Sequence, residues 1–180
     1  AFRDSEHAAN LFALKELGPI YTRLTNPTTD VLEQRFAALE GGAAAICVAS
    51  GQSAIFYAVA NVAEAGDNIL ISDKLYGGAV TLLSHTMKRF GITAKVFKSD
   101  DASDLESLID DKTKAIFFES LSNPQIAITD VEKVVEIAKK HGVLTICDNT
   151  VATAALFNPI KWGVDVVVHS TSKYTNGQGT

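Results

Sequence analysis

The stretch VEKVVEIAKKHGVLTICDNT, residues 131–150, contains the repeating unit from which the fold is predicted. Residues 131–141 place apolar side chains on one face of a helix, and these are Val131, Val134, Val135 and Ala138. The short apolar run 143–147 follows and predicts a strand that is buried on both sides. Polar residues come next at 148–150. The stretch therefore predicts a helix, a strand and a polar turn.

The same unit recurs along the chain and predicts the fold class. Strands are predicted where short runs are rich in Val, Ile or Phe, at 44–49, 68–72, 94–97, 115–119, 143–147 and 164–168. Helices are predicted at 31–39, 52–63, 79–90, 103–109 and 131–141, the first with Thr29 or Asp30 as its N-cap and Gly41 as its stop. Alternating strands and helices predict an α/β fold with three layers, α/β/α, and a mostly parallel sheet.

The composition predicts one substantial core and excludes several classes of partner. The chain has 180 residues, of which 47% are hydrophobic, enough for a single soluble domain. Its net charge is −5 and its basic residues are scattered, so neither nucleic acid nor an anionic membrane is an expected partner. No apolar run approaches the roughly 20 residues of a membrane span, and the N-terminus lacks the pattern of a signal peptide.

The two cysteines indicate a reducing compartment. Cys47 and Cys147 each lie in an apolar, strand-like run, which is typical of reduced core thiols. Neither a disulfide framework nor a metal site is expected. A cytoplasmic protein follows from these features together.

Polar residues follow most of the predicted strands and indicate one composite site. In open α/β sheets, ligands bind beyond the carboxyl ends of the strands. The segments at these ends are 50–52, 73–76, 120–123, 148–150 and 170–173. We expect their side chains to meet at one edge of the sheet.

Each of these segments also has an ordinary structural explanation. The turn around Gly51 and Gln52 could present helix N–H groups to a phosphate, or it could be a simple strand-to-helix turn. Asp148 could pair with a pyridinium nitrogen or cap the next turn. Lys173, partly desolvated after a buried strand, could form a Schiff base or be a solvated lysine. Tyr76 could stack on a flat cofactor or lie in a surface turn.

Five motifs taken together resemble a known family. They are YTRLTNPT (21–28), ASGQSA (49–54), YGG (76–78), DNT (148–150) and STSKY (170–174). Their order and spacing resemble the Cys/Met metabolism family of fold-type I pyridoxal-phosphate enzymes, over essentially the whole chain. The resemblance implies the large domain of such a transferase, with pyridoxal 5'-phosphate as its cofactor.

The resemblance also implies a role for each site residue. Lys173 would carry the Schiff base, Asp148 would pair with the pyridine nitrogen, and Tyr76 would stack on the ring, so these three are the expected catalytic residues. The phosphate would be bound by Gly51, Gln52, Ser170 and Ser172. Asn123 would lie near the phenolic oxygen of the cofactor and Thr150 beside its ring.

The N-terminal segment has an implied role of its own. The resemblance makes residues 1–27 an extended arm that reaches a neighbouring subunit, and residues 28–180 the cofactor-binding domain. Tyr21 and Arg23 would then complete the neighbour's site in a homodimer or homotetramer. An arginine fork is well suited to phosphate, although alone it would be an ordinary exposed residue.

The implied reaction is γ-replacement. The segments LFALKELGPIY (11–21) and TDVLE (29–33) resemble O-acetylhomoserine sulfhydrylases in particular. Such enzymes combine O-acetyl-L-homoserine with sulfide or a thiol and release acetate, giving homocysteine or methionine. A methionine γ-lyase, or a cystathionine γ-synthase or γ-lyase, is the alternative within the family, although methionine γ-lyases typically place a cysteine where Gly78 stands. Ser172 replaces the usual threonine and Gln52 a common methionine.

Two readings from other classes remain open. An NAD-binding module is disfavoured because the glycines do not follow the G-x-G-x-x-G pattern. A non-catalytic α/β fragment is the second hypothesis.

The chain ends seven residues after Lys173 in a glycine-rich loop. This predicts an incomplete large domain, a missing C-terminal domain and no turnover by this chain alone.

Overall fold

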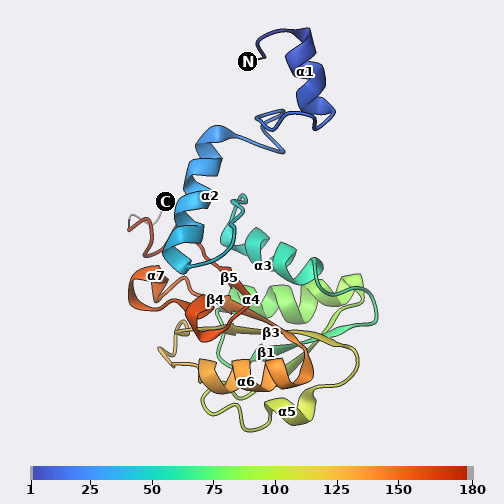
Figure 1. Cartoon of the computed structure of the whole chain (residues 1–180). Coiled ribbons are helices and arrows are strands. Elements are labelled where there is room, and N and C mark those ends of the chain that lie inside the picture. The colour runs from blue at the N-terminus through green and yellow to red at the C-terminus, as the bar shows by residue number, and fades with distance from the viewer. Residues whose placement is uncertain (1, 178–180) are drawn as a thin grey trace. The chain divides into compact units, whose positions relative to one another are not determined.

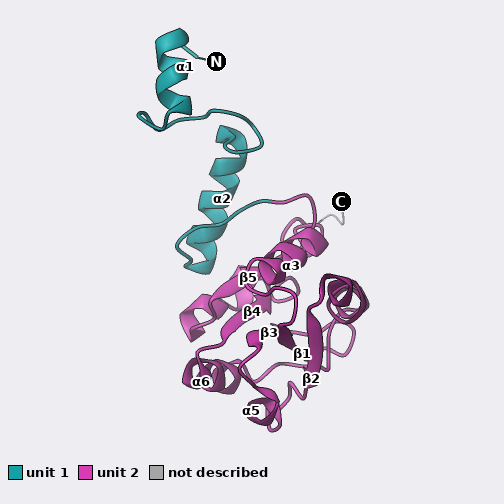
Figure 2. Ribbon diagram, turned by 90° about the vertical axis from the view of Figure 1, so that its right-hand side faces the viewer, with its two compact units in different colours: residues 1–47 teal, residues 48–180 magenta. Residues whose placement is uncertain are grey.

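The computed structural model describes residues 2–177 and divides the chain into two compact units. The units are residues 1–47 and 48–180 (Figure 2). Residues 178–180 of the predicted large domain, 28–180, lie outside the described residues.

The described part of the first unit, residues 2–47, contains two helices, α1 (Ser5–Phe12) and α2 (Pro27–Glu40). The arm was expected to be extended, and α1 corrects that expectation. The Asp4 carboxylate caps α1 by accepting the N–H of His7 at 2.7 Å. The second helix begins earlier than predicted because Asn26, rather than Thr29 or Asp30, is its N-cap. It stops as predicted at Gly41, which has a φ of 75°.

The second unit contains a five-stranded sheet in which all the strands are parallel. Its strands are β1 (Asn68–Ser72), β2 (Thr93–Phe97), β3 (Thr113–Glu119), β4 (Leu144–Asp148) and β5 (Val166–Val168). They are ordered β2-β1-β3-β4-β5. The chain adds β2 on one side of β1 and β3 on the other. The predicted parallel sheet is confirmed.

The predicted strand at 44–49 is wrong. These residues belong to none of the five strands, and the Ile46 side chain is 84% exposed. An apolar run forms a strand only where a neighbouring strand accepts and donates its backbone hydrogen bonds. Here the N–H of Cys47 donates instead to the Glu33 carboxylate, at 2.8 Å. Sequence pattern alone therefore overstated this element.

Helices cover both faces of the sheet (Figure 1). Between β1 and β2 lie α4 (Gly77–Thr81), a π-helical turn (Leu82–Thr86) and a 3-10 turn (Met87–Phe90). These pack with α3 (Gly51–Ala60) against Ile69, Ile71 and Phe117. The other face, with Leu70, Ile116 and Phe118, packs against α5 (Leu105–Leu108) and α6 (Val131–His141). Successive residues of one strand enter opposite cores, so the predicted three-layer architecture is confirmed.

Two short elements between β4 and β5 were not predicted. They are α7 (Thr153–Leu156) and the 3-10 turn η3 (Pro159–Trp162). Each has only one turn, too short for a periodic apolar pattern to show.

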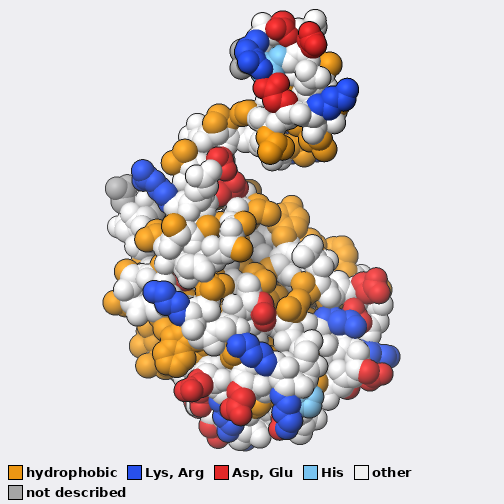
Figure 3. Space-filling view, viewed as in Figure 1, with side chains coloured by type: hydrophobic (Ala, Val, Ile, Leu, Met, Phe, Trp, Pro, Cys, Tyr) orange, Lys and Arg blue, Asp and Glu red, His pale blue; other side chains and the backbone are white. Residues whose placement is uncertain are grey.

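On the visible face of the second unit, basic and acidic side chains are interspersed (Figure 3).

Candidate functional site

The carboxyl ends of the central strands meet at one edge of the sheet. Glu119 at the end of β3 is paired in register with Asp148 at the end of β4. Asp148 is in turn paired with Val168 at the end of β5. The loops that carry the predicted site residues therefore start side by side, as expected.

Hydrogen bonds join the loops after β4 and β5. The Asp148 carboxylate accepts the N–H of Thr150 at 2.9 Å. The Thr150 hydroxyl oxygen accepts the N–H of Ser170 at 2.8 Å. One turn later, the N–H of Lys173 donates to the Ser170 carbonyl at 3.2 Å. The backbone of the lysine loop is thus tied to the loop that carries Asp148.

The lysine side chain itself is exposed in this chain. The sequence predicted that Lys173 would be partly desolvated, but the described residues do not shield its side chain from solvent. Ser172, beside it, is half-buried. The place of Lys173 after a short parallel strand is as predicted.

The N-terminus of α3 lies against the loop after β5. The Ser50 hydroxyl caps this helix by accepting the N–H of Ser53 at 3.1 Å. A Cβ atom at Gly51 would lie 2.7 Å from the Ser170 Cβ, so only glycine permits this approach. The first turn of a helix directs backbone N–H groups and a partial positive charge outward. Helix N–H groups and the Ser170 hydroxyl are thus placed together, as a phosphate would need.

The Tyr76 ring and the Gln52 amide both lie close to Gly78. A Cβ atom at Gly78 would lie 2.5 Å from Tyr76 Cε1 and 2.7 Å from Gln52 Nε2. Tyr76 is 50% exposed. The structure thus brings the loop after β1 to the start of α3.

Glu119 is a site residue that our reading of the sequence missed. It is only 4% exposed, and its Oε1 atom accepts the N–H of Tyr76 at 2.6 Å. Its Oε2 atom accepts the N–H of Asn123 at 3.0 Å. In the sequence it is the last residue of the apolar run predicted as the strand 115–119. The signal that drew attention to Asp148, a carboxylate at the end of a buried strand, was also present here.

The carboxyl groups of Glu119 and Asp148 are buried next to each other, so their ionised forms are unfavourable. Burial raises the pKa of Glu119 to about 7; the two N–H groups oppose this rise, and Asp148 adds to it. Burial also raises the pKa of Asp148, against the hydrogen bonds from Thr150 and the nearby His169. A cation beside Asp148 would relieve this cost. A protonated pyridine nitrogen is such a cation, so the residues present fit the predicted cofactor.

The remaining predicted site residues are less closely joined. The Asn123 side chain is exposed, and this residue enters the network through its backbone. Tyr21 and Arg23 belong to the first unit, where the Arg23 guanidinium carbon lies 5.3 Å from the centre of the Tyr21 ring. Their contribution to a neighbour's site stays a prediction.

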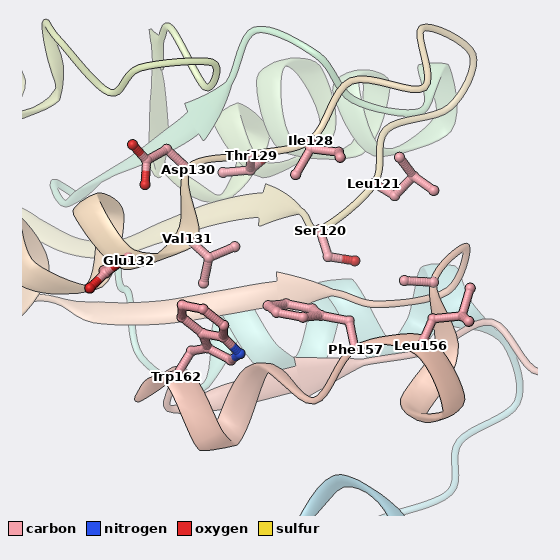
Figure 4. Close-up of a pocket in the computed structure, with 11 residues that line it drawn as sticks. Ser120, Leu121, Ile128, Thr129, Asp130, Val131, Glu132, Leu156, Phe157 and Trp162 are labelled. Carbon is pink, nitrogen blue, oxygen red and sulfur yellow. The ribbon is translucent and has the colours of Figure 1, made fainter.

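A separate apolar cavity lies near the same edge, toward α6. It has a volume of about 400 Å³ and lies between the loop 121–129 and the segment 156–162 (Figure 4). The rings of Phe157 and Trp162 line it, with their centres 5.9 Å apart. Ser120, from the predicted segment 120–123, lines this cavity, but none of the residues with a predicted cofactor role does. It is therefore distinct from the candidate cofactor site.

The described residues contain neither a metal-binding cluster nor a helix that could span a membrane. No group of three or more His, Cys, Asp or Glu side chains within 2–177 has an arrangement that would hold a metal ion. No helix in that range has the length and apolar character needed to cross a bilayer.

Comparison with protein families gives one match over the full length of the chain. Residues 1–180 match the model of the Cys/Met metabolism PLP-dependent enzymes. The chain belongs to this family. The predicted family and its pyridoxal-phosphate dependence are confirmed.

Relatives within the Cys/Met metabolism PLP-dependent enzymes are similar throughout the chain. A sulfhydrylase of Fusarium oxysporum f. sp. lycopersici is 49% identical over 99% of this chain and 42% of its own length. The O-acetyl-L-homoserine sulfhydrylase of Leptospira meyeri is 48% identical over 99% of this chain and 40% of its own length. The chain thus spans less than half of these relatives.

A solved member of the family has the same fold. It is a putative O-acetylhomoserine (thiol)-lyase from Campylobacter jejuni, 61% identical, with a TM-score of 0.94 over 100% of this chain and 44% of that one. That crystal structure contains a pyridoxyl-lysine phosphate. A cystathionine γ-lyase from Lactobacillus plantarum is 34% identical, with a TM-score of 0.90 over 99% of this chain and 45% of that one.

Proposed function

We propose that this protein catalyses γ-replacement on O-acetyl-L-homoserine with sulfide or a thiol, giving homocysteine or methionine and acetate. The observation that carries the proposal is a series of contacts at the carboxyl ends of the strands. Gly51 lies against Ser170, and hydrogen bonds connect Ser170 to Thr150 and Thr150 to Asp148. Asp148 is paired in register with Glu119, which binds the N–H of Tyr76. These contacts gather four of the five family motifs at one edge of the sheet. Relatives named O-acetyl-L-homoserine sulfhydrylase, 46–48% identical, support the choice of reaction.

The residues of this chain would divide the work of binding. Backbone N–H groups of Gly51 and Gln52, with the hydroxyls of Ser170 and Ser172, would hold the phosphate. Asp148 would keep the pyridine nitrogen protonated, while Thr150 and Asn123 would lie beside the ring. Tyr76 would cover one ring face. When bound, pyridoxal phosphate supplies an electron sink for negative charge at the substrate's α-carbon.

Lys173 would have two tasks in the reaction. Its amine is the proposed attachment point of the cofactor. Once the substrate amine replaces it, the released lysine would act as general base at the α-carbon and then as general acid. Lys173 would then remove a proton from the β-carbon as the bond from the γ-carbon to acetate breaks. A proton would return to the β-carbon when sulfide or a thiol adds at the γ-carbon.

Assembly and location are part of the same proposal. We propose that the arm 1–27 reaches a neighbouring subunit of a homodimer or homotetramer, and that 28–180 forms the cofactor-binding domain. Tyr21 and Arg23 would then complete the neighbour's phosphate site. A cytoplasmic biosynthetic enzyme is consistent with relatives named homocysteine/cysteine synthase.

The test is a spectrum followed by an assay on the protein at its natural length. Borohydride should abolish a visible cofactor band and leave the pyridoxyl mass on the peptide that contains Lys173. Lys173→Ala should lose the reducible band and at least 1,000-fold in activity, an order-of-magnitude expectation for a residue that transfers protons and holds the cofactor. Lys161→Ala, an exposed lysine on η3, is the matched control.

The assay also separates the reactions known in the family. O-acetyl-L-homoserine with sulfide should give homocysteine and acetate. Release of methanethiol from methionine at a comparable rate, with no acetate formed from O-acetyl-L-homoserine, would favour a γ-lyase instead. No cofactor band after addition of pyridoxal phosphate would contradict the proposal as a whole.

A further inference from the structure

A buried carboxyl group to which the proposed function gives no role lies at the centre of the site. Glu119 ends β3, and its two oxygens bind two different loops. Oε1 accepts the N–H of Tyr76 at 2.6 Å, and Oε2 accepts the N–H of Asn123 at 3.0 Å. One side chain therefore joins the loop after β1 to the loop after β3.

We propose that Glu119 is a positioning residue that fixes Tyr76 and Asn123 relative to each other, so that both face the cofactor ring. The inference rests on the proposed function, in which Tyr76 covers the ring and Asn123 lies near the phenolic oxygen. Glu119 itself would contact neither the substrate nor the cofactor. Its effect would pass through the backbones of the two residues it holds.

The sheet topology explains why such a bridge is needed. The loop after β1 leads to α4 on one face of the sheet, whereas the loop after β3 leads to α6 on the other face. Neighbouring strands whose connections leave to opposite faces open a crevice at the switch point, where ligands bind. Backbone pairing of β1 with β3 ends at Ile71 and Phe117, before either loop begins. Beyond that point the Glu119 side chain connects the two loops.

The bridge is held firmly at its base. The Glu119 carbonyl accepts the hydroxyl of buried Thr129 at 2.7 Å. The next N–H, that of Ser120, donates to the Asp148 carbonyl at 3.0 Å. Because the backbone is fixed on both sides, the carboxylate has little freedom to release either loop.

The contacts require a carboxylate rather than an amide. Both partners of Glu119 are backbone N–H donors, so the side chain must present two acceptors. Glutamine has nearly the same shape but offers one acceptor and one NH₂ group. In Glu119→Gln, the amide oxygen would still accept the N–H of one loop. The NH₂ group would face the N–H of the other loop, and two donors cannot form a hydrogen bond.

The first experiment measures cofactor binding in the protein at its natural length. The apoenzymes of wild type, Glu119→Gln, Glu119→Ala and the control Glu136→Gln are titrated with pyridoxal phosphate, and the visible spectrum is recorded. Glu136 is an exposed carboxylate on α6. We expect the apparent Kd to rise about tenfold in Glu119→Gln and further in Glu119→Ala, with a shifted band, and to be unchanged in the control.

A double-mutant cycle tests whether the effect passes through Tyr76. Tyr76→Ala removes the ring but keeps the backbone N–H that Glu119 binds. If Glu119 acts by orienting that ring, Glu119→Gln should weaken cofactor binding much less in the Tyr76→Ala background than in wild type. Equal effects in the two backgrounds would overturn the inference.

The outcomes distinguish the inference from the proposed function. If wild type forms no cofactor band, the proposed function fails and the inference fails with it. If wild type binds normally and Glu119→Gln keeps the wild-type Kd and spectrum, only the inference fails, even where the thermal midpoint falls. The isosteric Glu119→Gln provides this answer if Glu119→Ala does not fold.

Discussion

At the residue scale, two glycines determine how closely the elements of the site approach. Gly51 lets the first turn of α3 contact Ser170, and Gly78 leaves room for the Tyr76 ring and the Gln52 amide. Both belong to the sequence motifs, but Ser170, beside Gly51, and Gln52, beside Gly78, come from distant parts of the chain. Spacing along the sequence showed that small residues stand here; the fold showed what they make room for.

Gly51→Ala should weaken the phosphate site. The added Cβ would lie 2.7 Å from the Ser170 Cβ and 3.0 Å from its Cα, so α3 or the lysine loop must shift. We expect about 1–3 kcal/mol of lost stability and at least a tenfold rise in the Kd for pyridoxal phosphate. Gly42→Ala is the control, because its Cβ would come no closer than 3.7 Å to another atom. Equal effects of the two substitutions on the Kd would contradict this reading.

The stability of the apoenzyme should depend on pH through Glu119. Burial raises the pKa of this carboxyl to about 7, above its value in an unfolded chain. The folded state thus binds the proton more tightly, and the stability gained from protonation is lost as the pH rises through 7. Between about pH 5 and pH 8, wild type should lose about 2–3 kcal/mol of unfolding free energy relative to Glu119→Gln. Urea unfolding at several pH values measures this, and parallel curves would contradict it.

At the element scale, capping residues explain where the helices begin. Asn26 starts α2 by accepting two N–H groups, those of Thr28 at 2.9 Å and Thr29 at 3.3 Å, and Pro27 occupies the first helical position. The apolar pattern predicted the body of this helix but placed its start inside the first turn. Side-chain capping lies outside the periodic pattern and has to be weighed separately.

Asn26→Ala should loosen the start of α2. Loss of the cap is expected to cost about 1 kcal/mol and to speed hydrogen exchange in the first turn of the helix. Thr28→Ala is the matched control, since it keeps the backbone N–H that Asn26 binds. If both variants exchange alike in that turn, the cap does not hold the helix start.

At the scale of the whole molecule, the proposed assembly gives each of the two compact units its own task. The proposed cofactor residues from Gly51 to Lys173 lie in the second unit, and Tyr21 and Arg23 lie in the first. The proposal that this arm serves a neighbour makes the assembly itself testable.

Mixing two inactive variants should restore activity. Arg23→Ala subunits keep the lysine, and Lys173→Ala subunits keep the arginine, so a mixed dimer contains one complete site if Arg23 acts across the interface. Random reassortment should recover about a quarter of the wild-type activity, because half of the dimers are mixed and each has one intact site of two. No recovery after verified subunit exchange would mean that Arg23 acts within its own subunit.

The sequence by itself determined the parallel α/β architecture, the bounds of all five strands to within two residues, and the motifs that identify the family. Apolar periodicity and turn chemistry are local, so residues a few positions apart suffice to predict them. Only the tertiary structure decided that 44–49 is not a strand, that Lys173 is exposed in this chain, and that Glu119 joins two loops. Those outcomes depend on residues that are distant in the sequence. Tyr76 and Glu119, for example, are 43 positions apart. Strand order and register bring such partners together, and a linear pattern does not contain them.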